Sequence, residues 1–170
     1  MVSFSYRSHS PALRQCFSWQ LLPQEPATRS RSIGVSRGKY LRTWGPPVPG
    51  TGGCVFDFFV SNSGNATVLG PFTGTAEFKP NLCDGSYTGF FHWIAANGDA
   101  ISGPFFGQLI PTATQGVFDN NETAIVTGGT GRFTGATGMF TLGGQVNFIT
   151  SSFVLPWTGT ISSVGSNIRP

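Results

Sequence analysis

The chain has 170 residues, a length that suits one domain with an extension, and it is rich in Gly and Phe and poor in charged residues. Phe and Thr favour a pleated, half-buried sheet, whereas Gly is unfavourable in helices, so the composition predicts many short strands and not a helical fold. No apolar run in the sequence approaches the ~20 residues of a membrane-spanning helix.

The positive charge is concentrated near the N-terminus. Residues 1–44 carry seven Lys and Arg against one acidic residue, whereas residues 45–170 carry three against six. The basic balance therefore describes residues 1–44, and no nucleic-acid partner is predicted for the domain itself. Electrostatic contact of residues 1–44 with nucleic acid is an alternative that would show steep salt dependence.

Residues 1–44 are predicted to be a basic, disordered extension, because they combine several prolines with Ser-Arg pairs and lack sustained periodicity. Their Arg- and Ser-rich composition is typical of an organelle transit peptide, and an unstructured leader or a start codon placed too far upstream are the alternatives. No clear signal peptide is found, because the apolar cluster at residues 16–22 is short and interrupted. Residues 45–53, rich in Pro and Gly, are predicted to be a linker.

Residues 54–164 are predicted to form the folded domain. Residues 67–78 alternate between apolar and polar side chains, residues 86–95 are strongly aromatic, and Asn97-Gly98-Asp99 between them and the next run is a hairpin signal. Further strands are expected at 54–60, 101–109, 117–127, 136–142 and 153–161. Seven or eight strands at roughly 10–15-residue spacing are typical of an antiparallel barrel or sandwich.

A short pattern, G-[PR]-F-x-G, occurs three times, at residues 70–74, 103–107 and 131–135. In a strand the two glycines would flank the Phe on its own face, leave room for the ring and let the sheet bend, as a small barrel requires. We interpret the repeat as a sign of sheet curvature and not of catalysis.

The glycine-dense stretch at residues 127–138 invites a second interpretation as a dinucleotide-binding turn. Against it, a third glycine in step with Gly128 and Gly131 would fall at Thr134, the following residues favour a strand, and no acidic residue follows Glu122 to bind a ribose hydroxyl. The stretch is therefore predicted to be a tight turn between strands, with Phe133 as an apolar plug.

Residues 128–138, Gly-Gly-Thr-Gly-Arg-Phe-Thr-Gly-Ala-Thr-Gly, resemble the G-G-T-G-[KR]-F-x-x-A-x-G turn of the allene oxide cyclase and dirigent barrel-like superfamily. Residues 64–74 are similar to a segment of uncharacterised bacterial members, and the resemblance covers about residues 54–162. It implies an all-β, eight-stranded antiparallel, calycin-like β-barrel. Members are often secreted or organellar, so the resemblance favours such a location over a cytoplasmic one.

Characterised relatives in this superfamily hold an apolar substrate in the barrel mouth or lumen and steer its cyclisation or coupling without a metal. The matching turn is structural, so the resemblance assigns no catalytic residue. Bacterial relatives often carry His and Arg where this chain has Val68 and Pro71, so any function of those two groups is lost here.

The cysteines offer no metal site, because no C-x-x-C pair is present and only two histidines could assist. Neither a metal nor another cofactor is predicted. Cys54 and Cys83 would form a disulfide if neighbouring strands bring them together in an oxidising compartment, and the alternative is two small buried hydrophobic residues.

The candidate catalytic residues are Asp57, Tyr87 and His92. Asp57 interrupts an aromatic strand and would act as a general acid or base if it pointed inward, with solvent or a turn cap as its alternative. His92 shares a face of its strand with Ser86, Thr88, Phe90 and Ile94, where a hydrogen-bonded or solvent-facing histidine is the alternative. Tyr87 shares the opposite face with Phe91 and Trp93, which suits either the barrel core or an aromatic ligand wall.

Two other carboxylates receive structural assignments. Glu77 is predicted to be solvated on the polar face of its strand, and Glu122, after Asp119-Asn120-Asn121, is assigned to a loop edge.

Two functions follow from these observations. The first is binding of a small apolar molecule in the barrel mouth, with cyclase- or isomerase-like activity, Phe91 and Trp93 lining the site and Asp57 and Tyr87 as polar groups. The alternative is a non-enzymatic structural or interaction domain with a filled core. Homo-oligomerisation is left open. A cavity with a buried ionisable group would favour the first function.

Overall fold

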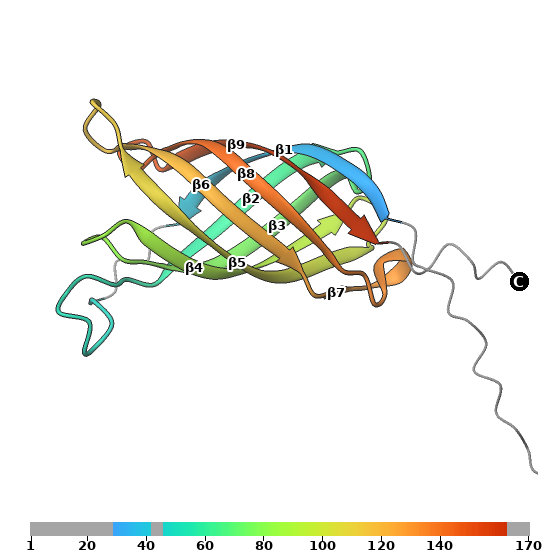
Figure 1. Cartoon of the computed structure of the whole chain (residues 1–170), viewed down its shortest axis with the longest axis horizontal. Helices are drawn as coiled ribbons and strands as arrows, with labels where there is room; N and C mark the ends of the chain where they lie inside the picture. The colour runs from blue at the N-terminus through green and yellow to red at the C-terminus, as the bar shows by residue number, and fades with distance from the viewer. Residues whose placement is uncertain (1–28, 42–45, 163–170) are drawn as a thin grey trace, which may run out of the picture.

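The computed structural model describes residues 29–41 and 46–162, and it is all-β (Figure 1). Eight long strands of this part of the chain pair antiparallel with their neighbours in chain order. The first and last of them, β1 and β9, also pair with each other, so the sheet closes into a barrel. The predicted fold class is therefore confirmed.

The strands follow one another along the chain, most of them through short loops. They are β1 (Arg29–Leu41), β2 (Phe58–Ala66), β3 (Gly70–Pro80), β4 (Ser86–Ala95), β5 (Ala100–Pro111), β6 (Val117–Val126), the two-residue β7 (Gly128–Gly129), β8 (Gly138–Asn147) and β9 (Ser152–Ser162). The three-residue 3-10 helix η1 (Gly131–Phe133) lies between β7 and β8. No helix of the described residues is long and apolar enough to span a membrane.

The barrel begins earlier in the chain than the sequence predicts. Residues 29–41, assigned above to the disordered extension, form β1, which pairs with β2 on one side and β9 on the other. Where the side chains of β1 are described, its inner face carries Ser32, Gly34, Ser36 and Gly38, and the two serines are almost completely buried. This face lacks the apolar alternation by which strands are recognised. Residues 1–28 and 42–45 lie outside the described residues.

The inner face of the barrel combines aromatic side chains with glycines directly opposite them on the next strand. A β-carbon at Gly74 would overlap the ring of Trp93, its register partner, and one at Gly34 in β1 would overlap Trp157. The same arrangement recurs at five further register pairs: Gly38–Phe153, Gly64–Phe72, Gly89–Phe105, Gly107–Tyr87 and Gly159–Phe140. Two glycines of the repeat, Gly74 and Gly107, thus make room for a ring on the neighbouring strand and not for the Phe of their own motif. The third copy of the motif lies in η1 and the turn after it, not in a strand.

The glycine turn closes one end of the barrel. Phe133 is completely buried, as predicted for an apolar plug. Arg132 lies on the outside of this end, where its Nε is 3.3 Å from Oδ2 of Asp99 and its Nη2 donates to the carbonyl of Leu69 at 3.2 Å. The turn leads directly into β8, which pairs antiparallel with β6, and no long helix follows it within the described residues, so the turn is a strand connection.

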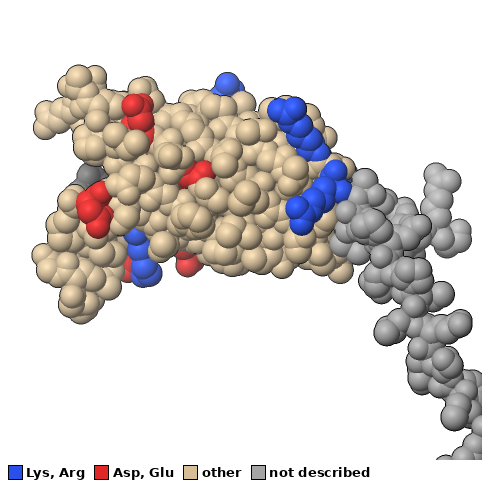
Figure 2. All heavy atoms as spheres, viewed as in Figure 1, with Lys and Arg blue, Asp and Glu red and all other residues tan. Residues whose placement is uncertain are grey.

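The opposite end, on the left in Figure 1, is formed by longer loops. A disulfide between Cys54 and Cys83 ties the segment before β2 to the β3–β4 turn, and Val55 bridges to Asn81 beside it. Of the two alternatives for these cysteines, the structure shows the disulfide. In the face shown in Figure 2, acidic atoms lie mainly toward this end and basic atoms mainly toward the glycine turn.

Candidate functional site

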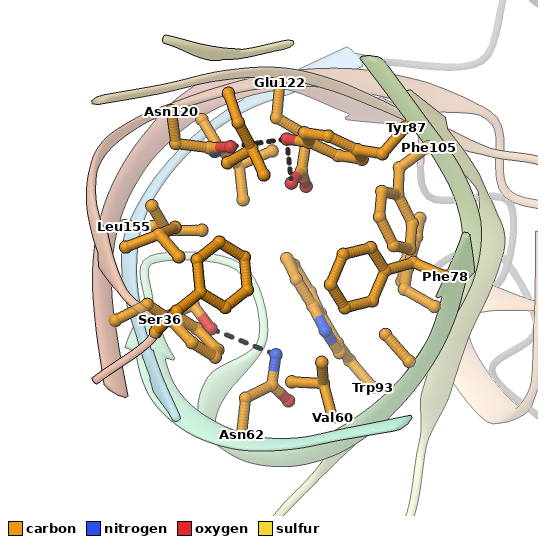
Figure 3. A pocket seen from close by; sticks show the side chains of 17 residues that line it. Ser36, Val60, Asn62, Phe78, Tyr87, Trp93, Phe105, Asn120, Glu122 and Leu155 are labelled. Carbon is orange, nitrogen blue, oxygen red and sulfur yellow. Dashed lines mark hydrogen bonds between the residues drawn. The ribbon is translucent and has the colours of Figure 1, made fainter. Parts of the chain in front are cut away.

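A cavity of about 60 Å³ lies in the lumen (Figure 3). Its wall includes Val60 near the start of β2 and Phe148 just after β8, both at the end of the barrel that carries the disulfide. Most of its wall is aromatic or aliphatic, with a few polar side chains among the apolar ones. Residues around it include Ser36, Val60, Asn62, Phe78, Tyr87, Trp93, Phe105, Asn120, Glu122 and Leu155.

Three polar side chains meet on one wall of this cavity. The hydroxyl of Tyr87 in β4 lies 2.9 Å from Oε2 of Glu122 and 2.5 Å from Oδ1 of Asn120, both in β6. Tyr87 and Asn120 are buried, and Glu122 is half-buried. The close-up in Figure 3 shows the carboxyl and the phenol pointing toward each other into the lumen. We call Tyr87, Asn120 and Glu122 the lumen triad.

The triad can form because β5, the strand between β4 and β6, has a glycine at the register position that faces Tyr87 and Glu122. Gly107 of β5 is the register partner of both Tyr87 and Glu122. A β-carbon at Gly107 would overlap the Tyr87 hydroxyl. The last glycine of the second G-[PR]-F-x-G motif therefore lets the tyrosine lie across β5 and reach the carboxyl on β6.

Burial raises the pKa of Glu122 from 4.5 to about 7, and hydrogen bonds from Tyr87 and Asn120 offset part of this effect. The apolar wall disfavours the ionised carboxylate because water is largely replaced by hydrocarbon around it. At neutral pH both protonation states of Glu122 are therefore populated, which is the condition for a group that both donates and accepts protons.

The direction of the hydrogen bonds within the triad depends on the protonation state of Glu122. The Tyr87 hydroxyl has one proton and lies between two oxygens, so it donates to only one of them. When Glu122 is protonated, its carboxyl donates to Tyr87, and Tyr87 donates to Asn120. When Glu122 is ionised, it accepts the Tyr87 proton itself. A change of charge on Glu122 thus reorients the tyrosine proton.

A second polar pair lies on the facing wall of the cavity. Nδ2 of Asn62 in β2 donates to the hydroxyl of Ser36 in β1 at 3.1 Å. Figure 3 shows this pair across the lumen from the triad, with aromatic rings between the two. The wall of the cavity is therefore mostly apolar, with a polar group on each of two facing sides.

Aromatic side chains surround the loop end of the lumen. The half-buried rings of Phe58, Phe118 and Phe148 pack against the core there. The ring centroid of Phe148 lies 6.1 Å from that of Phe58 and 5.4 Å from that of Phe118. These three residues form the aromatic mouth of the barrel.

Three of the five residues predicted for the site lie together in the lumen. Tyr87, Phe91 and Trp93 are buried on the inner face of β4 and line the cavity. His92 lies between Phe91 and Trp93 on the outer face and is exposed. Asp57 is also exposed, forms an ion pair with Lys79 and does not line the cavity.

Glu122 corrects the sequence interpretation, which assigned it to a loop edge. The polar run at residues 119–122 lies inside β6, where it pairs with β5 and β8. Counting back by two from the buried Val126 and Ala124 places Glu122 and Asn120 on the inner face. The alternation was present in the sequence, but the density of polar residues concealed it.

The described residues contain no group of three or more His, Cys, Asp or Glu side chains placed to hold a metal ion. No family model matches the chain, and neither does any curated protein or solved structure with which it was compared. Function is therefore inferred from the geometry of the lumen.

Proposed function

We propose that the barrel binds a small, largely apolar molecule in its aromatic mouth and in the lumen cavity next to it. We further propose that Glu122 acts on that molecule as an acid–base group in an isomerase- or cyclase-like reaction. The observation that carries the proposal is the carboxyl of Glu122 inside an apolar lumen, 2.9 Å from the Tyr87 hydroxyl.

A carboxyl at this position is costly for a purely structural core. An ionisable group in apolar surroundings destabilises the fold unless its charge is removed or paired, and no cation is paired with Glu122 among the described residues. A carboxyl with a pKa of about 7 is suited to taking a proton from carbon and returning it elsewhere. Tyr87 would position the carboxyl and stabilise its ionised form.

The cavity volume limits how the ligand lies. About 60 Å³ is more than one water needs and less than the ~150 Å³ cavity that holds benzene. The reacting end of the ligand would therefore enter the lumen beside Glu122, while the remainder would lie among Phe58, Phe118 and Phe148 at the mouth.

The glycine turn also supports this function, because it resembles that of a superfamily whose characterised members hold apolar substrates in the barrel. Val68 and Pro71, the positions at which this chain departs from the bacterial relatives, do not line the cavity. Their difference therefore leaves the lumen triad unaffected. The Cys54–Cys83 disulfide supports an oxidising, secreted or organellar location.

The small volume favours a second function, a structural or interaction domain with a filled core. In that case the inner rings and glycines serve packing alone, and loops or the outer surface carry the function. The two functions differ in what happens when Glu122 loses its acid–base group.

A proton-transfer probe tests the proposal. Conversion of 3-cyclohexen-1-one to 2-cyclohexen-1-one removes a proton from C2 and adds one at C4, and ultraviolet absorbance follows the conjugated product. We expect the protein to accelerate this reaction, and Glu122→Gln, which keeps the side-chain shape, to lower the enzymatic rate about 100-fold or more. Equal rates for the two proteins, or no rate above buffer, would support the structural domain.

A further inference from the structure

A row of side chains crosses the outer face of the barrel from β2 to β4. Glu77 in β3 is the register partner of Phe59 in β2 on one side and of Phe90 in β4 on the other. Side chains that are directly opposite on one face of an antiparallel sheet lie about 5 Å apart at their β-carbons. The carboxylate therefore stands between two phenyl rings, on the opposite side of the wall from the lumen.

These three residues line a groove of about 480 Å³. Asp57, Lys79 and Thr88 are also part of its wall. The volume falls within the range of about 300–1,000 Å³ that is typical of small-molecule sites, in contrast to the lumen cavity. We call this the outer groove.

The outer groove carries one uncompensated negative charge. Asp57 and Lys79 form an ion pair with each other. Glu77 is exposed and makes no hydrogen bond or ion pair within the described part of the chain. Phe90 is 51% exposed, and Phe59 is half-buried. A carboxylate thus remains available between two accessible aromatic rings.

This combination selects a particular kind of cation. The faces of aromatic rings are electronegative and attract positive charge, and the carboxylate adds an ionic attraction. A compact ammonium group is strongly hydrated and keeps its water. An ammonium nitrogen that carries several methyl groups is less well hydrated, and its methyl groups pack on the rings while the charge faces the carboxylate.

We propose that the outer groove is a binding site for a quaternary ammonium group of a small molecule, with Phe59 and Phe90 as its walls and Glu77 as its counter-ion. The groove shares Phe78 with the wall of the lumen cavity and Phe58 with the aromatic mouth, but none of the triad residues, and its three proposed binding residues lie on the outer face of the barrel. A finding that the groove binds no quaternary ammonium group would leave the proposed lumen function unaffected. A finding that Glu122 has no catalytic role would likewise leave the proposal for the groove unaffected.

Choline and its uncharged analogue 3,3-dimethyl-1-butanol provide a matched pair of probes, since they share a shape and differ in charge. Titrations followed by amide chemical shifts at constant ionic strength should show saturable choline binding, with perturbations at β2, β3 and β4. We expect the neutral analogue to bind at least about fivefold more weakly. Phe90→Leu should weaken choline binding about two- to fivefold, as the loss of one exposed cation–π contact predicts.

Glu77→Gln should weaken choline binding by a similar or larger factor, because it removes the counter-ion and keeps the shape. Phe106→Leu is the matched control: Phe106 is an exposed Phe on β5 that does not line the groove, so choline affinity should stay unchanged. Glu122→Gln should likewise leave choline affinity unchanged. Circular dichroism would establish that each variant is folded.

Three results would overturn the proposal. They are equal affinity for choline and its neutral analogue, equal affinity of wild type and Glu77→Gln, and absence of saturable choline binding at tens of millimolar. Sedimentation would identify one competing use of the groove: a wild-type oligomer that Phe90→Leu converts to a monomer would make this face a contact between copies of the chain.

Discussion

The hydroxyl of Tyr87 reaches Oε2 of Glu122 across Gly107, at a distance of 2.9 Å. The two residues lie on β4 and β6, which are separated by β5, and only the missing side chain on β5 allows the contact. A glycine motif that shapes the barrel wall thereby also creates the polar group in its lumen. Gly107 therefore contributes both to the packing of the barrel wall and to the contact between Tyr87 and Glu122.

Glu122→Gln should change the pH dependence of stability. The pKa of Glu122 is about 7 in the folded protein and 4.5 for the unperturbed group, so between these values the folded state holds a proton that the unfolded state has lost. The free energy of unfolding therefore falls as the pH rises from about 4.5 to about 7, by at most ~3 kcal/mol, and then levels off. Urea unfolding across this range should show the fall in wild type and not in Glu122→Gln.

The exposed Glu77 supplies the control for this measurement, because Glu77→Gln should retain the fall with pH. Near pH 8 we expect Glu122→Gln to be more stable than wild type, since the amide carries no charge to bury. Parallel curves for wild type and Glu122→Gln from pH 4.5 to 7 would show that the carboxyl is not buried.

Gly107→Ala should break the contact between Tyr87 and Glu122. The added methyl group overlaps the Tyr87 hydroxyl, and moving the ring in a packed core costs about 1–3 kcal/mol. Gly128→Ala is the matched control, because a β-carbon there meets no atom within 4 Å. Thermal unfolding should show a clear loss for Gly107→Ala and little change for Gly128→Ala. Equal melting temperatures for the two variants would contradict the packing described here.

Reduction of the Cys54–Cys83 disulfide should destabilise the loop end of the barrel. The bond joins residues 29 positions apart, and the loss of a loop constraint of this length corresponds to about 3–4 kcal/mol in the chain-entropy model. The double variant Cys54→Ser/Cys83→Ser should unfold at lower denaturant concentration than wild type, and a reductant should shift wild type toward the variant. Wild type that is unaffected by a reductant able to open the bond would contradict this expectation.

Much of the barrel could be predicted because its inner and outer faces differ in polarity. In β3, Phe72, Ala76 and Phe78 alternate with polar residues, and the Asn97-Gly98-Asp99 turn marks the hairpin between β4 and β5. The glycine turn was also assigned correctly as a connection between strands, with Phe133 as its buried residue. At these elements the alternation of apolar and polar residues in the sequence matches the positions of their side chains in the barrel.

Strand β1 could not be predicted in this way, because its apolar contacts come from other strands. Gly34 and Gly38 face the rings of Trp157 and Phe153, so the hydrophobic part of each contact belongs to β9. Glu122 was missed for a related reason. Its polar neighbours predict a loop locally, whereas pairing on both sides holds the segment in the sheet and turns every second polar side chain inward.

Phe133→Ala should destabilise the barrel at the glycine turn without changing the ionisation of Glu122. Phe133 is completely buried beneath the glycine turn, and its truncation should cost about 3–5 kcal/mol. The residue does not line the cavity, so the ionisation of Glu122 should keep its midpoint in the folded variant. Carboxyl carbon chemical shifts would report that midpoint, and a large displacement would mean that the two ends are coupled.

The ionisation of Glu122, followed by its carboxyl carbon chemical shift with and without 2-cyclohexen-1-one, tests the central claim most directly. We predict a midpoint near pH 7 in the free protein, because burial raises the pKa of the carboxyl. The midpoint should rise when the probe binds, since the protonated carboxyl donates to the probe's carbonyl and the ionised one cannot. A midpoint near 4.5 that the probe does not move would contradict a buried acid–base group in the lumen and the function proposed from it.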